Sequence, residues 1–209
     1  MKKGTMKDNP TDNASARLLS AVSSIAQERR HDIDEKKHPE RWDQSNFIWE
    51  ALLISMATMG NSRGKALVRE EHHHKLITWE ALKALGSSQE RLTRLDETLR
   101  DAKVRMAAKK ALWLAENFLR IEDQGGPDAV KCELQNCEGR GGKIAFLKTF
   151  KGIGKKYARN MMMDVYHRDF HDSIAIDARI KKVSETLGVT FQEYADEERF
   201  YLQVAHDAD

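Results

Sequence analysis

The 209-residue chain contains few prolines, few cysteines and no long apolar run. No segment approaches the roughly eighteen apolar residues that a membrane helix needs, and the N-terminus lacks the apolar core of a signal peptide. With only three prolines and few alternating apolar runs, the sequence predicts an all-α fold. We therefore expect a helical protein of the cytoplasm that has no membrane as a partner.

The two cysteines, Cys132 and Cys137, lie in a glycine-rich stretch, 125–142, that we expect to be a loop. Two thiolates cannot hold a four-cysteine iron–sulfur cluster, and a zinc site would need two further ligands. The three consecutive histidines at 72–74 would point to different faces of a helix, which favours a solvated helix end over a metal site. The sequence therefore predicts no metal centre.

Positive charge is concentrated between residues 143 and 168, which hold seven Lys or Arg and one acid, although the whole chain has a net charge of +2. Apolar residues at helical spacing stand on both sides of Gly152 and Gly154, so we expect a helix, a tight hairpin and a second helix at about 143–166. Glycines let a backbone approach a phosphate, and the start of the second helix offers unpaired N–H groups to the same anion. The alternative is a solvated hairpin whose lysines only keep it soluble.

A second short pattern follows the hairpin. The apolar run 173–176 ends at Asp177, and apolar residues then repeat at helical spacing until Gly188. This pattern predicts that Asp177 caps the start of a helix, which is the common role of an aspartate in this place. Lys156, twenty-one positions earlier, stands at the start of the hairpin's second helix.

These two patterns resemble the helix-hairpin-helix (HhH-GPD) DNA glycosylase superfamily, and within it most closely the short 8-oxoguanine DNA glycosylase/AP lyases. The family's Leu/Phe-x-Gly-hydrophobic-Gly-x-Lys hairpin corresponds to residues 150–156, and its hydrophobic-hydrophobic-Asp segment corresponds to 174–177. The resemblance implies two helical lobes with a DNA-binding cleft, formed by residues 14–209 after a loose N-terminal segment, 1–13.

The same resemblance implies the chemistry. An ionised Asp177 would stabilise positive charge that develops on the deoxyribose as the glycosidic bond breaks. The amine of Lys156 would form a Schiff base with the sugar and promote β-elimination. Lys155 is a competing amine, but a helix turns by about 100° per residue, so both lysines cannot face one cleft. The register of the motif favours Lys156 as the nucleophile and places Lys155 at a phosphate.

The partner implied by the resemblance is double-stranded DNA with a damaged base, bound by a monomer associated with the nucleoid. In the family, the turn after the helix that begins near Phe47 fills the gap left by the flipped base. A plain polar loop is the alternative there. No cofactor is expected, although a backbone-bound monovalent cation at the hairpin is compatible with the sequence. The candidate DNA contacts are Asn61, Ser62, Arg63, Lys151, Gly152, Gly154, Lys155 and Arg159.

Three functions fit these observations. The first is a bifunctional glycosylase and AP lyase for an oxidised base, with 8-oxoguanine as the expected lesion. The second is the same scaffold acting on an oxidised pyrimidine or an alkylated base. The third is a DNA-binding module without chemistry. Residues 190–209 carry six acids and one arginine, so this final helix should face away from DNA.

Overall fold

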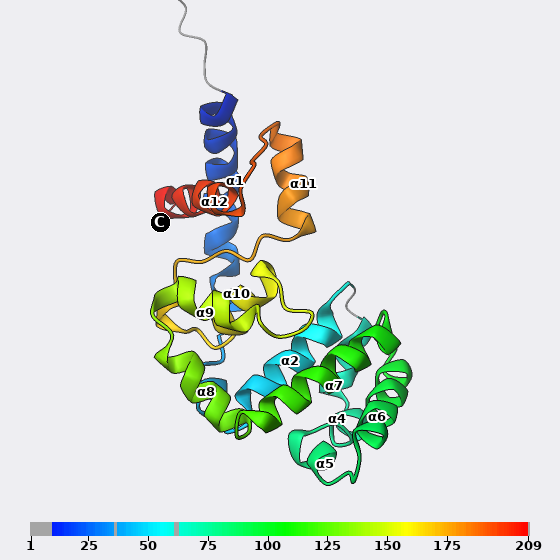
Figure 1. Cartoon of the computed structure of the whole chain (residues 1–209). Helices are drawn as coiled ribbons and strands as arrows, with labels where there is room; N and C mark the ends of the chain where they lie inside the picture. Colours follow the sequence, from blue (N-terminus) through cyan, green and yellow to red (C-terminus); the bar gives the residue numbers. More distant parts are fainter. Residues whose placement is uncertain (1–9, 36, 61–62, 209) are drawn as a thin grey trace, which may run out of the picture.

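The computed structural model describes residues 10–35, 37–60 and 63–208. Within these ranges the chain forms helices and connecting turns and contains no β-strand, which confirms the all-α prediction (Figure 1). The α-helices are α1 (Pro10–Asp34), α2 (Phe47–Thr58), α3 (Ala66–Arg69), α4 (Glu71–His74), α5 (Trp79–Lys83), α6 (Ser88–Asp101), α7 (Ala107–Asp123), α8 (Pro127–Asn136), α9 (Gly139–Leu147), α10 (Lys155–Met163), α11 (Ala178–Leu187) and α12 (Tyr194–Ala208). Three short 3-10 helices are η1 (Pro39–Asp43), η2 (Arg63–Lys65) and η3 (Arg168–Phe170).

Helix α2 runs through the centre of the hydrophobic core. Nine of its twelve residues are buried, because its sequence is apolar on nearly every side and other helices cover it all round. Trp49 fixes its position: the indole N–H donates a hydrogen bond of 2.8 Å to the carbonyl of Ile77, and the ring meets Phe118 edge-on at 5.6 Å. The N-terminal part of α2 is therefore held firmly beside the helices that follow it in the chain.

The start of α7 and the stretch 125–142 depend on local backbone preferences. Helix α7 begins only at Ala107, because Lys103 and Met106 take positive φ angles of 55° and 59° that a right-handed helix cannot include. The stretch 125–142, expected to be a loop, forms α8 and the start of α9. Pro127 starts α8 at a position where proline favours a helix, and apolar side chains at helical spacing bury one face of it.

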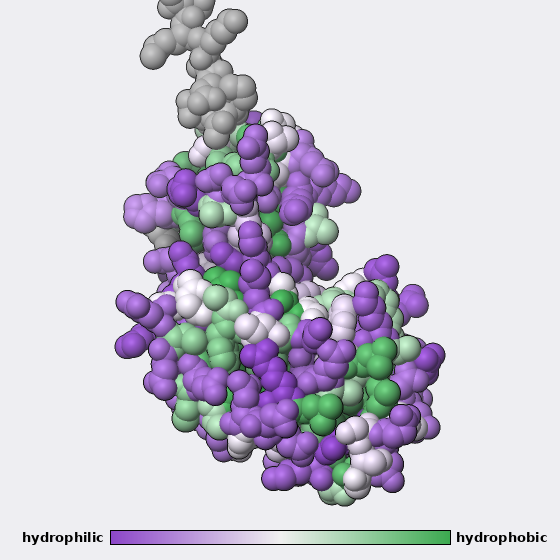
Figure 2. Space-filling view, in the orientation of Figure 1, coloured by the Kyte–Doolittle hydropathy of each residue, from purple (hydrophilic) through white to green (hydrophobic). Residues whose placement is uncertain are grey.

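The first and last helices pack against each other. Figure 1 shows α1, α11 and α12 at one end of the molecule and α2 to α10 at the other, with α1 and α12 packed against each other. Helix α1 begins at Pro10, so the part of the predicted loose segment at 10–13 is helical, and residues 1–9 lie outside the described ranges. Figure 2 shows that the molecular outline is hollowed on the side where α11 faces the C-terminal end of α2. None of the described helices is long and apolar enough to cross a membrane.

Candidate active site

The predicted hairpin is present and its tip is packed tightly. Helix α9 ends at Leu147, α10 begins at Lys155, and Gly152 between them has a φ of 82°. A Cβ at Gly152 would lie 2.6 Å from Met56 Cε and 2.7 Å from a ring carbon of Trp113. Only glycine fits this position, because both the backbone angle and the contact distance exclude a side chain.

A buried asparagine on α7 holds the hairpin. Asn117 accepts a hydrogen bond of 2.8 Å from the backbone N–H of Lys151 and donates one of 3.1 Å to its carbonyl. Arg120, one turn further along α7, donates to the carbonyl of Thr149 at 2.7 Å. Sequence reasoning missed both residues, since nothing in a single sequence links positions that are 29 or 34 residues apart.

The outer side of the hairpin is open and basic. Gly154 is the N-cap of α10, and a Cβ there would meet nothing within 4 Å. The first N–H groups of α10 therefore face open space, where an anion could accept hydrogen bonds from them. Lys151 and Lys155 are both exposed beside this point, and the ammonium of Lys151 forms an exposed ion pair with Glu116 at 3.3 Å. This surface suits a phosphate backbone.

The two adjacent lysines have different surroundings. Lys155 is exposed, whereas Lys156 is half-buried, with its Nζ 4.6 Å from the centre of the Tyr157 ring. The aromatic face holds the amine by a cation–π contact. Of the two lysines, Lys156 is therefore the one whose amine is held by a neighbouring side chain.

Asp177 caps α11 and has a lowered pKa. Its carboxylate accepts hydrogen bonds from the backbone N–H groups of Arg179 at 2.8 Å and Ile180 at 3.1 Å. Burial would raise the pKa of Asp177, but these two hydrogen bonds and the positive charge of Lys156 outweigh it and hold the pKa below the ordinary 3.8. The charge of Lys156 therefore acts on Asp177, and the carboxyl is ionised at neutral pH.

The end of α2 joins the same group of residues. Burial and the charge of Asp177 raise the pKa of the Tyr157 hydroxyl, while a hydrogen bond with Thr58 acts in the opposite direction. Thr58 is the last residue of α2, so the C-terminal end of α2 and the N-terminal ends of α10 and α11 meet here. This is also where the outline is hollowed in Figure 2.

Helix α12 supports the segment that leads into Asp177. Glu198 accepts hydrogen bonds from the Ser173 hydroxyl at 3.0 Å and the Ile174 N–H at 3.1 Å. The hydroxyl of Tyr194 donates to the Ile174 carbonyl at 3.0 Å and accepts from the Ile176 N–H at 2.8 Å. Every one of these bonds fixes the backbone immediately before Asp177. The sequence identified α12 only as an acidic surface and missed this role.

The same network removes one predicted DNA contact. Arg159 is buried, with 8% of its surface exposed, and its guanidinium pairs with Glu198 through contacts of 2.9 and 2.6 Å. It also lies 4.3 Å from the centre of the Tyr194 ring. The prediction that Arg159 binds DNA is therefore wrong, because its charge is directed inward to a carboxylate that is itself buried.

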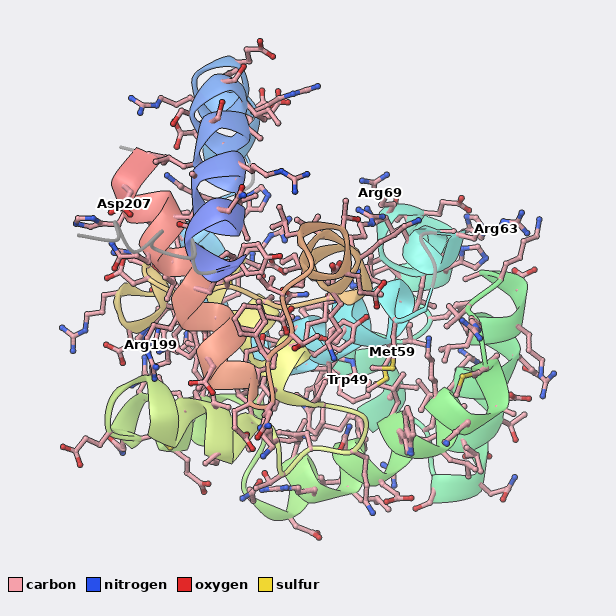
Figure 3. All side chains as sticks on the ribbon, turned by 90° about the horizontal axis from the view of Figure 1, so that it is seen from above. Trp49, Met59, Arg63, Arg69, Arg199 and Asp207 are labelled. Atoms are coloured by element: carbon pink, nitrogen blue, oxygen red, sulfur yellow. The ribbon has the colours of Figure 1, made fainter. Side chains whose placement is uncertain are left out.

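The predicted insertion turn is only partly described. Asn61 and Ser62 lie outside the described residues, while Arg63 begins η2 and is exposed. Arg63 and Arg69 project outward from this part of the molecule, whereas Trp49 lies in its interior (Figure 3). The turn thus leaves α2 beside basic side chains, which suits a position close to DNA.

A buried lysine anchors the residues just before this turn. Lys110 on α7 is fully buried, and its Nζ donates hydrogen bonds of 2.7 Å to the carbonyls of Met56 and Met59. Burial, together with the charge of Arg105, lowers the pKa of Lys110 to about 8. Its two bonds satisfy carbonyls that the end of α2 leaves without helical partners. This lysine is a further residue that the sequence pattern did not single out.

A hollow of about 570 Å³ lies next to the site. Thr58 lines it, together with Arg41, Glu50, Lys65 and Asp164. Asp164 follows the end of α10, eight positions after Lys156, and helix geometry sets the two about 80° apart around the axis. Burial raises the pKa of the Asp164 carboxyl, against the effect of the nearby Arg41 charge. The hollow is therefore lined mostly by polar and charged side chains, with Ile54 and Val68 as its apolar residues.

Comparisons with known proteins agree with this architecture. No family model and no curated protein matches the sequence. The fold is similar to the crystal structure of the 8-oxoguanine DNA glycosylase of Methanocaldococcus jannaschii, with a TM-score of 0.64 and 16% sequence identity. The match covers 95% of this chain and 89% of that chain. The predicted glycosylase-like fold is confirmed.

Proposed function

Starting from this fold, we propose that the protein is a bifunctional DNA glycosylase and AP lyase that removes an oxidised base, with 8-oxoguanine as its substrate. The proposal rests on the positions of Lys156 at the start of α10 and Asp177 at the start of α11, where the charge of the lysine helps to keep the carboxyl ionised. A DNA-binding module without chemistry has no need of a positioned amine next to a carboxylate of lowered pKa.

In the proposed reaction, Nζ of Lys156 bonds to C1′ of the damaged nucleotide as the bond to the base nitrogen breaks. The base leaves with the electron pair and takes up a proton, and the ionised Asp177 stabilises the positive charge that builds up on the sugar. Opening of the sugar ring gives a Schiff base. Loss of a C2′ proton then expels the 3′ phosphate, which nicks the strand.

The surfaces around Lys156 and Asp177 would bind the phosphate backbone and the flipped base. The open N-terminus of α10 and the exposed Lys151 and Lys155 would bind the phosphate backbone, as the hairpin's charge suggests. The hollow lined by Thr58 and Asp164 would receive the flipped base. Its polar groups, including the half-buried Glu50, offer hydrogen-bond partners to the edge of a purine.

Borohydride trapping tests the proposal. Duplexes that contain 8-oxoguanine, an abasic site or undamaged guanine are incubated with the wild type, Lys156→Ala and Asp177→Asn. Lys155→Ala is the matched control, because it removes the adjacent amine and leaves Lys156 in place. We expect a covalent adduct on the 8-oxoguanine duplex with the wild type and Lys155→Ala, no adduct with Lys156→Ala, and a strong loss of base release with Asp177→Asn.

The other outcomes distinguish the alternatives. Trapping on the abasic site alone would retain the lyase and direct the search to oxidised pyrimidines and alkylated bases. An adduct that survives in Lys156→Ala but disappears in Lys155→Ala would reverse the assignment of the nucleophile. No adduct on either damaged duplex would refute the lysine mechanism.

A further inference from the structure

Three potential metal ligands lie together at the junction of α3 and α4. They are Glu70, His72 and His73, whose donor atoms all lie within 4.8 Å of one another. The sequence predicted that this histidine run is a solvated helix end, but His73 is buried, with 5% of its surface exposed. A carboxylate and an imidazole that face each other at a partly buried position require an explanation.

The hydrogen bonding of His73 leaves one ring nitrogen without a partner. Its Nε2 lies 3.0 Å from the carboxylate of Asp101, so Nε2 carries the hydrogen and donates it. The other nitrogen, Nδ1, is buried and has no hydrogen-bond partner among the described residues. It lies 3.4 Å from Oε2 of Glu70, so a lone pair faces a carboxylate oxygen. Two acceptors in this arrangement repel each other unless a proton or a metal ion lies between them.

The distances fit a tetrahedral metal centre. With bonds of 2.0 to 2.1 Å, neighbouring ligands around a zinc ion lie about 3.3 Å apart. The oxygen of Glu70 is 3.4 Å from His73 Nδ1 and 3.6 Å from His72 Nε2, distances that are long for hydrogen bonds and close to this tetrahedral edge. The side chain of His72 is exposed and can turn toward the ion without disturbing the core.

The surroundings also resemble those of natural zinc sites. A histidine that binds a metal usually donates its other ring N–H to a carboxylate, which fixes the tautomer and the ring orientation. Asp101, at the end of α6, has this position relative to His73. Imidazole and carboxylate ligands suit zinc among the common divalent ions. The third histidine is different, because His74 Nε2 bonds to Glu50 at 2.8 Å and takes no part in the group.

We propose that Glu70, His72 and His73 bind one zinc ion, that Asp101 orients His73 from outside the coordination sphere, and that water occupies the fourth position. The ion would join the short helix α4 to the end of α6 through the contact between His73 and Asp101. None of these residues belongs to the Lys156 and Asp177 group, so the metal serves local structure and takes no part in the glycosylase reaction.

Zinc titration of the full chain, made without a histidine tag and stripped with a chelator, tests the site. Calorimetry should show one zinc ion per chain, and cobalt in place of zinc should give the intense visible absorption of a tetrahedral centre. Glu70→Gln and His72→Ala should each weaken zinc binding by about tenfold or more, and Asp101→Asn by about 10- to 100-fold. These three residues are exposed, so the variants should fold.

His74→Gln is the matched control, because it removes a histidine of the same run that is not a proposed ligand. It should keep the affinity of the wild type for zinc. Failure of the wild type to bind zinc would overturn the proposal, and so would unchanged binding in both Glu70→Gln and His72→Ala. Since the readouts are binding and absorption, neither result depends on whether the protein excises a base.

Discussion

Asn117 on α7 and Lys151 at the hairpin exchange two hydrogen bonds, one donated and one accepted by the same side chain. The asparagine amide thus pairs with the backbone of Lys151 as a neighbouring strand would. Because Asn117 is 1% exposed, water cannot replace either bond. The geometry of the hairpin is therefore fixed from the helix beneath it and does not depend on the hairpin's own sequence alone.

We expect Asn117→Ala to lower the free energy of unfolding by about 2 to 4 kcal/mol, because it leaves two backbone groups of Lys151 without partners. Urea unfolding measures this loss. Glu116→Ala is the control: it removes an exposed ion pair with the same Lys151 and should cost less than about 1 kcal/mol. Equal losses in the two variants would contradict the assigned role of the asparagine.

The two glycines of the hairpin should respond differently to alanine. Gly152→Ala combines a positive φ with contacts of 2.6 and 2.7 Å, so we expect a loss of about 2 kcal/mol or more in unfolding free energy. Gly154→Ala meets no protein atom and should cost about 1 kcal/mol as a poorer helix cap.

DNA affinity separates the two glycines further. If the backbone at Gly154 lies against a phosphate, Gly154→Ala should weaken binding to an abasic duplex by about tenfold while the protein stays folded. Fluorescence anisotropy measures the affinity, and thermal unfolding checks the fold. Wild-type affinity in Gly154→Ala would show that DNA does not approach the hairpin at this glycine.

Glu198→Gln should destabilise the protein at neutral pH by about 3 kcal/mol, because it leaves the buried Arg159 without its counter-charge. Burial acts to raise the pKa of Glu198, but the hydrogen bonds from Arg159 and Ile174 outweigh it and place the pKa below 4.5. A carboxyl with a depressed pKa stabilises the fold fully above 4.5 and loses this contribution as the pH falls through the folded-state value. The difference between wild type and variant in urea unfolding should therefore shrink from pH 7 to pH 3, and a constant difference would refute the assignment.

Lys110 should also make stability rise with pH, in this case at alkaline pH. Its pKa is about 8 in the folded protein against an ordinary 10.5, so between these values the unfolded chain binds more protons than the folded one. Stability contributed by this group therefore rises with pH across that window. Compared with Lys110→Met, the wild type should gain unfolding free energy from pH 8 to pH 10. Parallel pH profiles of the two proteins would contradict the lowered pKa of the buried amine.

Local signals made much of this structure predictable. The hairpin, the capping role of Asp177 and the end of α11 at Gly188 all depend on residues next to one another in the chain, and the structure confirms each of them. Helix geometry indicated that Lys155 and Lys156 cannot face one cleft, and the structure shows Lys155 exposed and Lys156 half-buried. Their separate roles stay a prediction of the motif register. Interactions between residues close in the sequence were therefore sufficient to predict the turn and the helix caps.

Contacts between residues far apart in the chain could not be predicted from the sequence. Arg159 belongs to a basic segment, and nothing nearby in the chain shows that Glu198, thirty-nine residues later, neutralises it. The break before α7 depends on Lys103 and Met106, whose residue types give no sign of a positive φ. Glycines suggested a loop at 125–142, although apolar spacing within that stretch was enough to form α8.

The bonds from α12 to the segment before Asp177 also set an order of events during synthesis. A ribosome releases the hairpin and Lys156 first, then residues 173–176, and only afterwards Tyr194 and Glu198. Until those two side chains emerge, the backbone that positions Asp177 has none of the hydrogen bonds that α12 donates and accepts. A chain that is still being synthesised can thus form the hairpin before it can hold Asp177 in place. The proposed site is therefore complete only after α12 has been synthesised.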